Sequence, residues 1–135
     1  MKKFLSIISI LIIMLTTSAC NPENKPSIIF NQRPITVENV RDMSSVFKPG
    51  TRIYYLILMP QVQHSRILDI QIIKKGAQEY LGYSSYMSRT IRLKDEEQKY
   101  FTDYMVINET GAFIMRVYSK DNPTKILTQA EFYVR

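Results

Sequence analysis

Short runs of β-branched and aromatic residues, separated by turn-forming residues, limit most strongly what this chain can fold into. The strongest run extends from Thr51 to Met59, stops at Pro60 and is apolar at nearly every position. Such a run predicts a central strand with both faces largely covered. Phe47-Lys48-Pro49-Gly50, just before it, predicts a turn, because proline fixes φ and glycine accepts a positive φ. The other runs that we expect to form strands are 27–30, 35–37, 67–74, 89–93, 99–107, 112–118 and 126–134.

Period-two alternation predicts which side chains of the strands face inward. The expected inward sets are Leu68, Ile70 and Ile72; Phe113, Met115 and Val117; and Ala130, Phe132 and Val134. In 99–107, Phe101 and Val106 would face opposite sides, which suggests a bulge or a register shift. The stretch 77–88 is the least regular part, and no segment keeps a long helical period.

About seven or eight short strands with turns at this spacing predict an all-β antiparallel sandwich, with a small closed β-barrel as the alternative. A local motif points the same way. Glu109-Thr110-Gly111-Ala112-Phe113 resembles the acidic-x-Gly-x-Tyr corner of immunoglobulin-like domains, with Phe113 in place of the tyrosine. The chain lacks that family's disulfide and core tryptophan, since it has one cysteine and no tryptophan. The resemblance implies an immunoglobulin-like architecture over roughly 27–135 and assigns no functional residue.

The first twenty residues have the layout of a secretory leader. Lys2 and Lys3 precede an apolar run, 4–15, which is shorter than the roughly 20 residues of a membrane span. The small residues Thr17-Ser18-Ala19 then lead to Cys20. This segment resembles the signal of a bacterial lipoprotein, although Thr17 stands where leucine is usual. The resemblance implies cleavage before Cys20 and attachment of lipid, including palmitate, to that cysteine.

These features divide the chain into a signal peptide, 1–19, a lipidated cysteine with a flexible tether, 20–27, and a β-sandwich domain, 28–135. The tether has two prolines and no large apolar residue, so we expect an extended spacer of roughly 20 Å. We therefore expect a protein of the cell envelope, held on a membrane by its lipid. Asn21 is not the aspartate that marks inner-membrane retention in similar lipoproteins, which favours the outer membrane where a cell has one.

Composition narrows the set of partners. The chain has 18 basic and 12 acidic residues, and two of the basic residues, Lys2 and Lys3, lie in the leader. The charges alternate in sign, without the clustered basic stripe of a nucleic-acid-binding domain, so no nucleic-acid partner is expected. Cys20 is the only cysteine, so the domain must be stabilised by packing without a disulfide.

The residues that carry chemistry do not form a recognisable catalytic set. His64 is the only histidine, and it lies in a polar loop beside Ser65, whereas a triad needs groups that converge in space. Asp95-Glu96-Glu97, with Asp103, has carboxylates but not the spacing of a calcium loop. The glycines are isolated, so no phosphate-binding loop is present. We expect no cofactor, no metal site and no enzymatic activity.

Three tyrosines in the irregular stretch, Tyr80, Tyr83 and Tyr86, are the candidate contact surface, because aromatic residues on loops serve in recognition. The alternative is that these rings belong to the core or to a sheet edge. The sequence thus predicts a membrane-anchored, non-catalytic binding or structural module of the bacterial envelope. Its expected partners are the membrane, through the lipid, and an envelope protein or glycan. The alternatives are an envelope enzyme and an accessory subunit of an envelope assembly.

Overall fold

The computed structural model describes residues 25–60, 65–76, 83–94 and 99–135, except for the side chains of Tyr83 and Ser84. These residues form strands and turns, and no helix. The strands are β1 (Ser27–Asn31), β2 (Val46–Phe47), β3 (Arg52–Leu58), β4 (Ile67–Lys75), β5 (Tyr83–Arg92), β6 (Tyr100–Val106), β7 (Gly111–Ser119) and β8 (Ile126–Val134).

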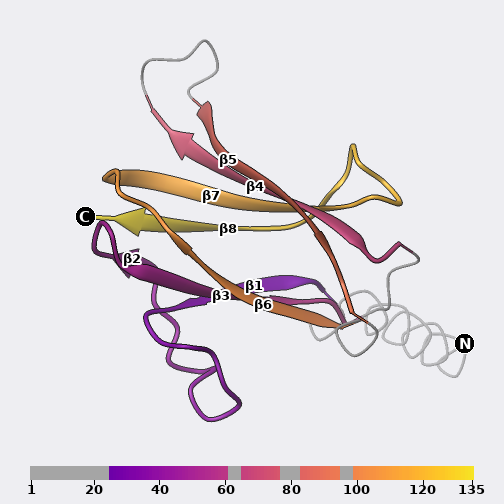
Figure 1. Ribbon diagram of the computed structural model, residues 1–135, viewed down its shortest axis with the longest axis horizontal. Helices are drawn as coiled ribbons and strands as arrows, with labels where there is room; N and C mark the ends of the chain where they lie inside the picture. Colours follow the sequence, from indigo (N-terminus) through magenta and orange to yellow (C-terminus); the bar gives the residue numbers. More distant parts are fainter. Residues whose placement is uncertain (1–24, 61–64, 77–82, 95–98) are drawn as a thin grey trace, which may run out of the picture.

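The strands form two sheets that lie one above the other (Figure 1). The small sheet has the order β1-β3-β6, and the large sheet has the order β2-β8-β7-β4-β5. All pairs are antiparallel except β2 with β8. In this order β4, β7 and β8 correspond to strands C, F and G of an immunoglobulin domain, and β1, β3 and β6 to A, B and E. The predicted immunoglobulin-like sandwich is therefore confirmed, and the described strands do not close into a barrel.

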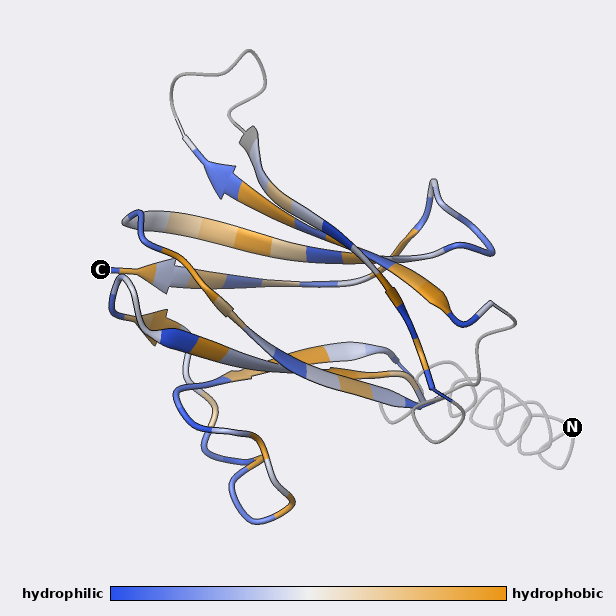
Figure 2. Ribbon diagram, viewed as in Figure 1, coloured by the Kyte–Doolittle hydropathy of each residue, from blue (hydrophilic) through white to orange (hydrophobic). Residues whose placement is uncertain are grey.

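The core lies between the two sheets and is built by the alternation along each strand. Figure 2 shows apolar and polar residues alternating along several of the strands. The predicted inward residues of β4 and β7 are buried, as are Phe132 and Val134 of β8, while Ala130 packs against the core. An aromatic cluster joins the sheets: Phe132 contacts Phe30 with ring centroids 4.9 Å apart and stacks on Phe113 at 5.6 Å.

Phe113, near the start of β7, takes the position of the corner tyrosine and is fully buried. It has no hydroxyl, so it contributes packing instead of the hydrogen bond that gives that corner its name. Its ring meets Phe132 on one side and Tyr86 edge-on at 5.4 Å on the other. The turn before β3 is as predicted: Thr51 N–H donates to the Lys48 carbonyl, and Gly50 has a φ of 76°.

Three sequence expectations on strands need correction. Residues 35–37 form no strand, since Asn39 organises this segment as a loop and turn. The bulge expected in 99–107 is absent, because β6 pairs with β3 in unbroken register and Met105, not Val106, faces the core. The irregular stretch instead contains the first half of β5. There the register passes from Ile72↔Met87 to Ile73↔Ser85, so an extra residue, Tyr86, interrupts the alternation.

A fourth correction concerns the strand expected to be covered on both faces. β3 is central in its sheet, and its inward residues Ile53, Tyr55 and Ile57 are buried. Its outward residues, Tyr54, Leu56 and Leu58, are only half-buried. The outer face of the small sheet is therefore open in part, and it is where the candidate site lies.

Candidate functional site

The outer face of the small sheet is an apolar and aromatic surface arranged in cross-strand rows. The register places Ser27, Leu58 and Tyr100 in one row and Ile29, Leu56 and Thr102 in the next. Further rows contain Tyr54 with Tyr104, and Arg52 with Val106. Along β6 every outward residue is exposed. This face thus presents large side chains that the core does not use.

A loop, residues 32–45, lies over one part of this face and is fixed by Asn39. The Asn39 side-chain amide donates to the Pro34 carbonyl at 2.7 Å, and its Oδ1 accepts from the Thr36 N–H at 2.8 Å. The Asn39 carbonyl accepts a further hydrogen bond from the side chain of Asn31 on β1 at 3.3 Å. These bonds shape the loop and tie it to the sheet. Figure 1 shows this segment, between β1 and β2, outside the sandwich on the side of the small sheet.

Between the loop and the sheet lies an apolar groove with a volume of about 500 Å³. Its lining residues are Ile35, Thr36, Val37, Val40, Leu56, Leu58, Lys99, Tyr100 and Thr102. Val37 is 93% exposed and Tyr100 is 43% exposed, so the groove is open to its surroundings. Among the described lining residues, Lys99 is the one with a charge.

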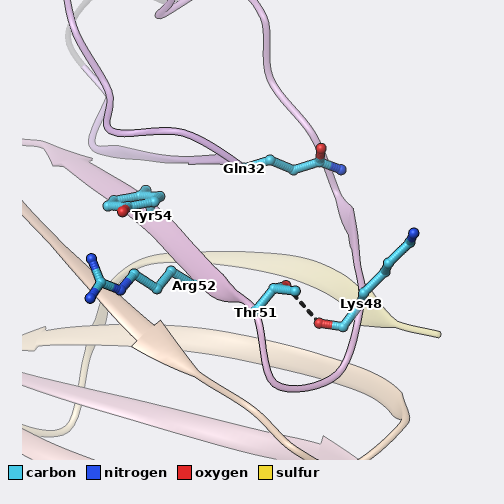
Figure 3. Close-up of a pocket in the computed structure, with 5 residues that line it drawn as sticks. All are labelled: Gln32, Lys48, Thr51, Arg52 and Tyr54. Atoms are coloured by element: carbon cyan, nitrogen blue, oxygen red, sulfur yellow. Dashed lines mark hydrogen bonds between the residues drawn. The ribbon is translucent and has the colours of Figure 1, made fainter.

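A second hollow, the basic pocket, lies at the other end of β3 and has a volume of about 360 Å³. It is lined by Gln32, Lys48, Thr51, Arg52 and Tyr54 (Figure 3). In Figure 3 the side chains of Arg52 and Lys48 extend in opposite directions, and Gln32 lies across from Arg52 and Tyr54.

Aromatic rings hold Arg52 in place. Its guanidinium carbon lies 4.7 Å from the centre of the Tyr104 ring, and that ring lies 5.8 Å from the ring of Tyr54. A hydrogen bond with Tyr54 and, to a smaller degree, the charge interaction with Tyr104 raise the pKa of Arg52. Arginine is cationic at any physiological pH, and the contact with the Tyr104 ring favours this orientation of the guanidinium.

The cations of the basic pocket have no acidic partner among the described residues. The nearby carboxylates are used elsewhere: Asp103 forms an ion pair with Arg89, and Glu109 with Lys74 at 2.8 Å. An oriented guanidinium and a lysine without carboxylate partners form a place for anionic groups of a ligand. The described lining residues offer two cations, one amide, one aliphatic hydroxyl and one phenol to a ligand.

Of the residues singled out from the sequence, only Tyr86 has a described side chain among the three tyrosines, and it lies apart from this face. Tyr86 lies on β5 with its ring half-buried against Phe113. Tyr83 begins β5, opposite Lys75, and its side chain is not described. Tyr80, Cys20, His64 and residues 95–97 lie outside the described residues, so the tyrosine contact surface and the lipid site stay predictions.

The described part of the chain has neither a cluster of metal ligands nor a membrane-spanning helix. No group of three or more His, Cys, Asp or Glu side chains there is arranged to hold a metal ion. Within the same ranges there is no helix with the length and apolarity needed to cross a membrane.

The sequence did not predict the exposed outer face of the small sheet, because Leu56 and Leu58 follow the pattern of a buried strand. One signal was available: the loop segment Ile35-Thr36-Val37 is apolar but is followed by polar residues at 38 and 39, as in a loop with exposed apolar side chains. The basic pocket joins Gln32 to Arg52, which are far apart in sequence, so only the fold brings them together.

No family model and no curated protein matches this sequence. Solved structures with a similar shape include a superoxide reductase (neelaredoxin) from Ignicoccus hospitalis, which is 8% identical, with a TM-score of 0.47 over 83% of this chain and 79% of the other. An immunoglobulin-like protein from Pseudomonas aeruginosa is 14% identical, with a TM-score of 0.47 over 82% and 90%. A Pseudomonas fluorescens alkylpurine DNA glycosylase is 13% identical, with a TM-score of 0.38 over 80% and 30%. No residue role is carried over from these proteins.

Proposed function

We propose that this chain is a lipid-anchored, non-catalytic binding module of a bacterial envelope. In this proposal Cys20 carries the lipid and the sandwich presents the basic pocket to a partner. The observation that carries the proposal is the pair of cations, Arg52 and Lys48, which line an open pocket without acidic partners among the described residues.

An acidic glycan is the class of partner that fits the pocket best. The two cationic side chains extend in opposite directions from the pocket, which suits a ligand with acidic groups spaced along its length (Figure 3). Arginine pairs with carboxylates through two parallel hydrogen bonds, and Tyr54 offers an aromatic ring beside the guanidinium for the apolar side of a sugar. Gln32 and Thr51 add an amide and a hydroxyl at the margin.

The anchor is tested first. Cells that make the wild-type protein or Cys20→Ser are fed labelled palmitate, and the membranes are separated from the soluble fraction. We expect label in the wild-type protein alone and release of the serine variant, because two or three acyl chains on Cys20 would hold the protein stably on the membrane. A wild-type protein without label, together with a serine variant that stays with the membranes, contradicts the lipid anchor.

The pocket is tested by titrating the detergent-solubilised protein with an oligogalacturonate, against its neutral methyl ester. Arg52→Gln should weaken binding of the acidic oligomer about tenfold or more, since a charge-assisted hydrogen bond contributes about 1.5–3 kcal/mol. Arg135→Gln is the matched control, because Arg135 also lies over a tyrosine ring, at 5.3 Å from Tyr133, but does not line the pocket. Equal affinity for the acid and the ester, or equal losses in both variants, would show that the pocket is not an acidic-glycan site.

A further inference from the structure

The apolar groove has no role in the fold or in the proposed glycan site. Val37 projects from the loop with 93% of its surface exposed, and Tyr100 is 43% exposed across the groove. Leu56 and Leu58 form the floor between them and are half-buried. Single exposed apolar residues are ordinary on a protein surface, but a continuous apolar hollow is typical of a contact with a partner or a membrane.

The groove lies beside the point where the chain enters the domain. Ser27, the first residue of β1, pairs with Leu58, and Leu58 pairs with Tyr100. Because neighbouring strands are about 4.8 Å apart, Tyr100 lies roughly 10 Å from Ser27. The entry point is fixed to the large sheet as well, since Thr128 of β8 donates a hydrogen bond to the Pro26 carbonyl at 3.2 Å.

The chain that precedes this point is short. Only six residue steps separate Pro26 from Cys20, and a fully extended chain spans at most about 3.6 Å per residue. A lipid on Cys20 therefore keeps Pro26 within roughly 22 Å of the lipid attachment point. The groove, next to Pro26, lies at the end of the domain nearest to that point.

We propose that the groove rests on the phospholipid bilayer that holds the Cys20 lipid, with Val37 and Tyr100 at the boundary of headgroups and acyl chains. This inference rests on the proposed lipid anchor. Surface-bound segments bury their apolar side roughly 5–10 Å deep, and tyrosine is enriched at this level of the membrane. The bilayer then acts as the second anchoring contact beside the lipid itself.

The charges of the described residues around the groove agree with a membrane-facing position. Lys25 and Lys99 lie at this end, where they meet lipid phosphates. The loop charges cancel, since Arg33 and Arg41 are balanced by the acids at 38 and 42. Apolar insertion, and not charge alone, is therefore the main contribution. The basic pocket begins at Arg52, six strand residues from Leu58, so it lies about 20 Å further along β3 and stays open to a partner.

The test uses the absence of tryptophan from the chain. Val37→Trp and Val46→Trp each introduce a single fluorophore at an exposed valine. Val46 is the matched control, because β2 lies with the carboxyl terminus at the end of the sandwich away from Leu58 (Figure 1). The lipidated variants are reconstituted into vesicles of phosphatidylethanolamine and phosphatidylglycerol, with or without brominated acyl chains, and membrane attachment is measured by flotation.

We expect both variants to float, and only Val37→Trp to show a blue shift and loss of fluorescence with brominated lipid. If both variants float and are quenched equally, or neither is quenched, the docking proposal is wrong while the lipid anchor stands. A Val37→Trp emission that changes with protein concentration but not with bromination would assign the groove to a second copy of the chain and also overturn the proposal. Failure of the protein to float would contradict the anchor, and with it both proposals.

Discussion

Alkaline pH should destabilise this domain through one buried tyrosine, Tyr55. Its side chain is 2% exposed, and its ring lies 6.3 Å from that of Phe101. Together with Arg89 it lines a cavity of about 110 Å³ between the sheets. Burial is the main cause that raises the pKa of Tyr55 to about 12, and the negative charge of Asp103 adds to it, while Arg89 acts in the opposite direction.

The magnitude follows from the difference between the folded and unfolded states. A tyrosine in the unfolded chain has a pKa of about 10, so the unfolded state loses the phenol proton first as pH rises. The contribution of neutral Tyr55 to stability is therefore complete below about pH 10 and is lost as pH approaches 12. Two pKa units correspond to about 2.7 kcal/mol in total, of which about 1.4 kcal/mol is lost by pH 11. Domains of this size are stable by only about 5–15 kcal/mol.

The assay compares the free energy of unfolding in urea at pH 8 and pH 11 for the wild type and Tyr55→Phe. We expect the wild type to lose about 1.4 kcal/mol more than the variant over this interval. The comparison cancels the titration of lysines and of the other tyrosines, because both proteins share them. Tyr118→Phe, which removes a hydroxyl from the outer face of β7, controls for the loss of a tyrosine. Parallel curves for the wild type and Tyr55→Phe would refute the reasoning.

The remaining predictions concern stability. Phe132→Ala should lower the free energy of unfolding in denaturant by about 3–5 kcal/mol, because its ring contacts three others. Phe101→Ala, at a half-buried position, should lower it clearly less. Equal losses would show that the aromatic cluster does not stabilise the core as described. Gly50→Ala should lower the free energy of unfolding by about 1–2 kcal/mol, since the φ of Gly50 is +76°. Gly76→Ala, with open space at the added Cβ, should change the unfolding midpoint little. An unchanged midpoint for Gly50→Ala would refute this prediction. Tyr86→Ala should lower stability by about 1–3 kcal/mol; an unchanged midpoint with weaker partner binding would favour the tyrosine contact surface instead.

The strands that alternate cleanly were predictable because burial on one face leaves a period of two in the sequence. β4, β7 and β8 matched within a residue or two, and their inward residues were assigned correctly. β5 was half missed because Tyr86 is inserted at a bulge, so the tyrosine spacing of three does not follow the strand period. The loop before β2 was mistaken for a strand because β-branched residues occur both in strands and on the apolar wall of a groove.

The candidate site was not predictable, for two physical reasons. A pocket that joins Gln32, Lys48 and Arg52 depends on the pairing of β1 with β3, which is a long-range property of the fold. The exposure of Leu56 depends on how little of the small sheet the loop covers, and hydropathy alone does not report this. The tyrosines at 80, 83 and 86 were conspicuous in the sequence because of their spacing of three. Between Tyr83 and Tyr86 that spacing falls on β5, where the bulge at Tyr86 interrupts the strand alternation.

The two faces of β3 have different roles. Ile53, Tyr55 and Ile57 face the core and are almost fully buried, so they account for the stabilising part of the strand. Leu56 and Leu58, on the other face, are only half-buried, at positions where an antiparallel sheet with one solvated face carries polar residues. This outer face is therefore more apolar than a solvated sheet face usually is. The proposed bilayer contact would cover these apolar side chains, because the groove lies beside Pro26, where the chain enters the sheets.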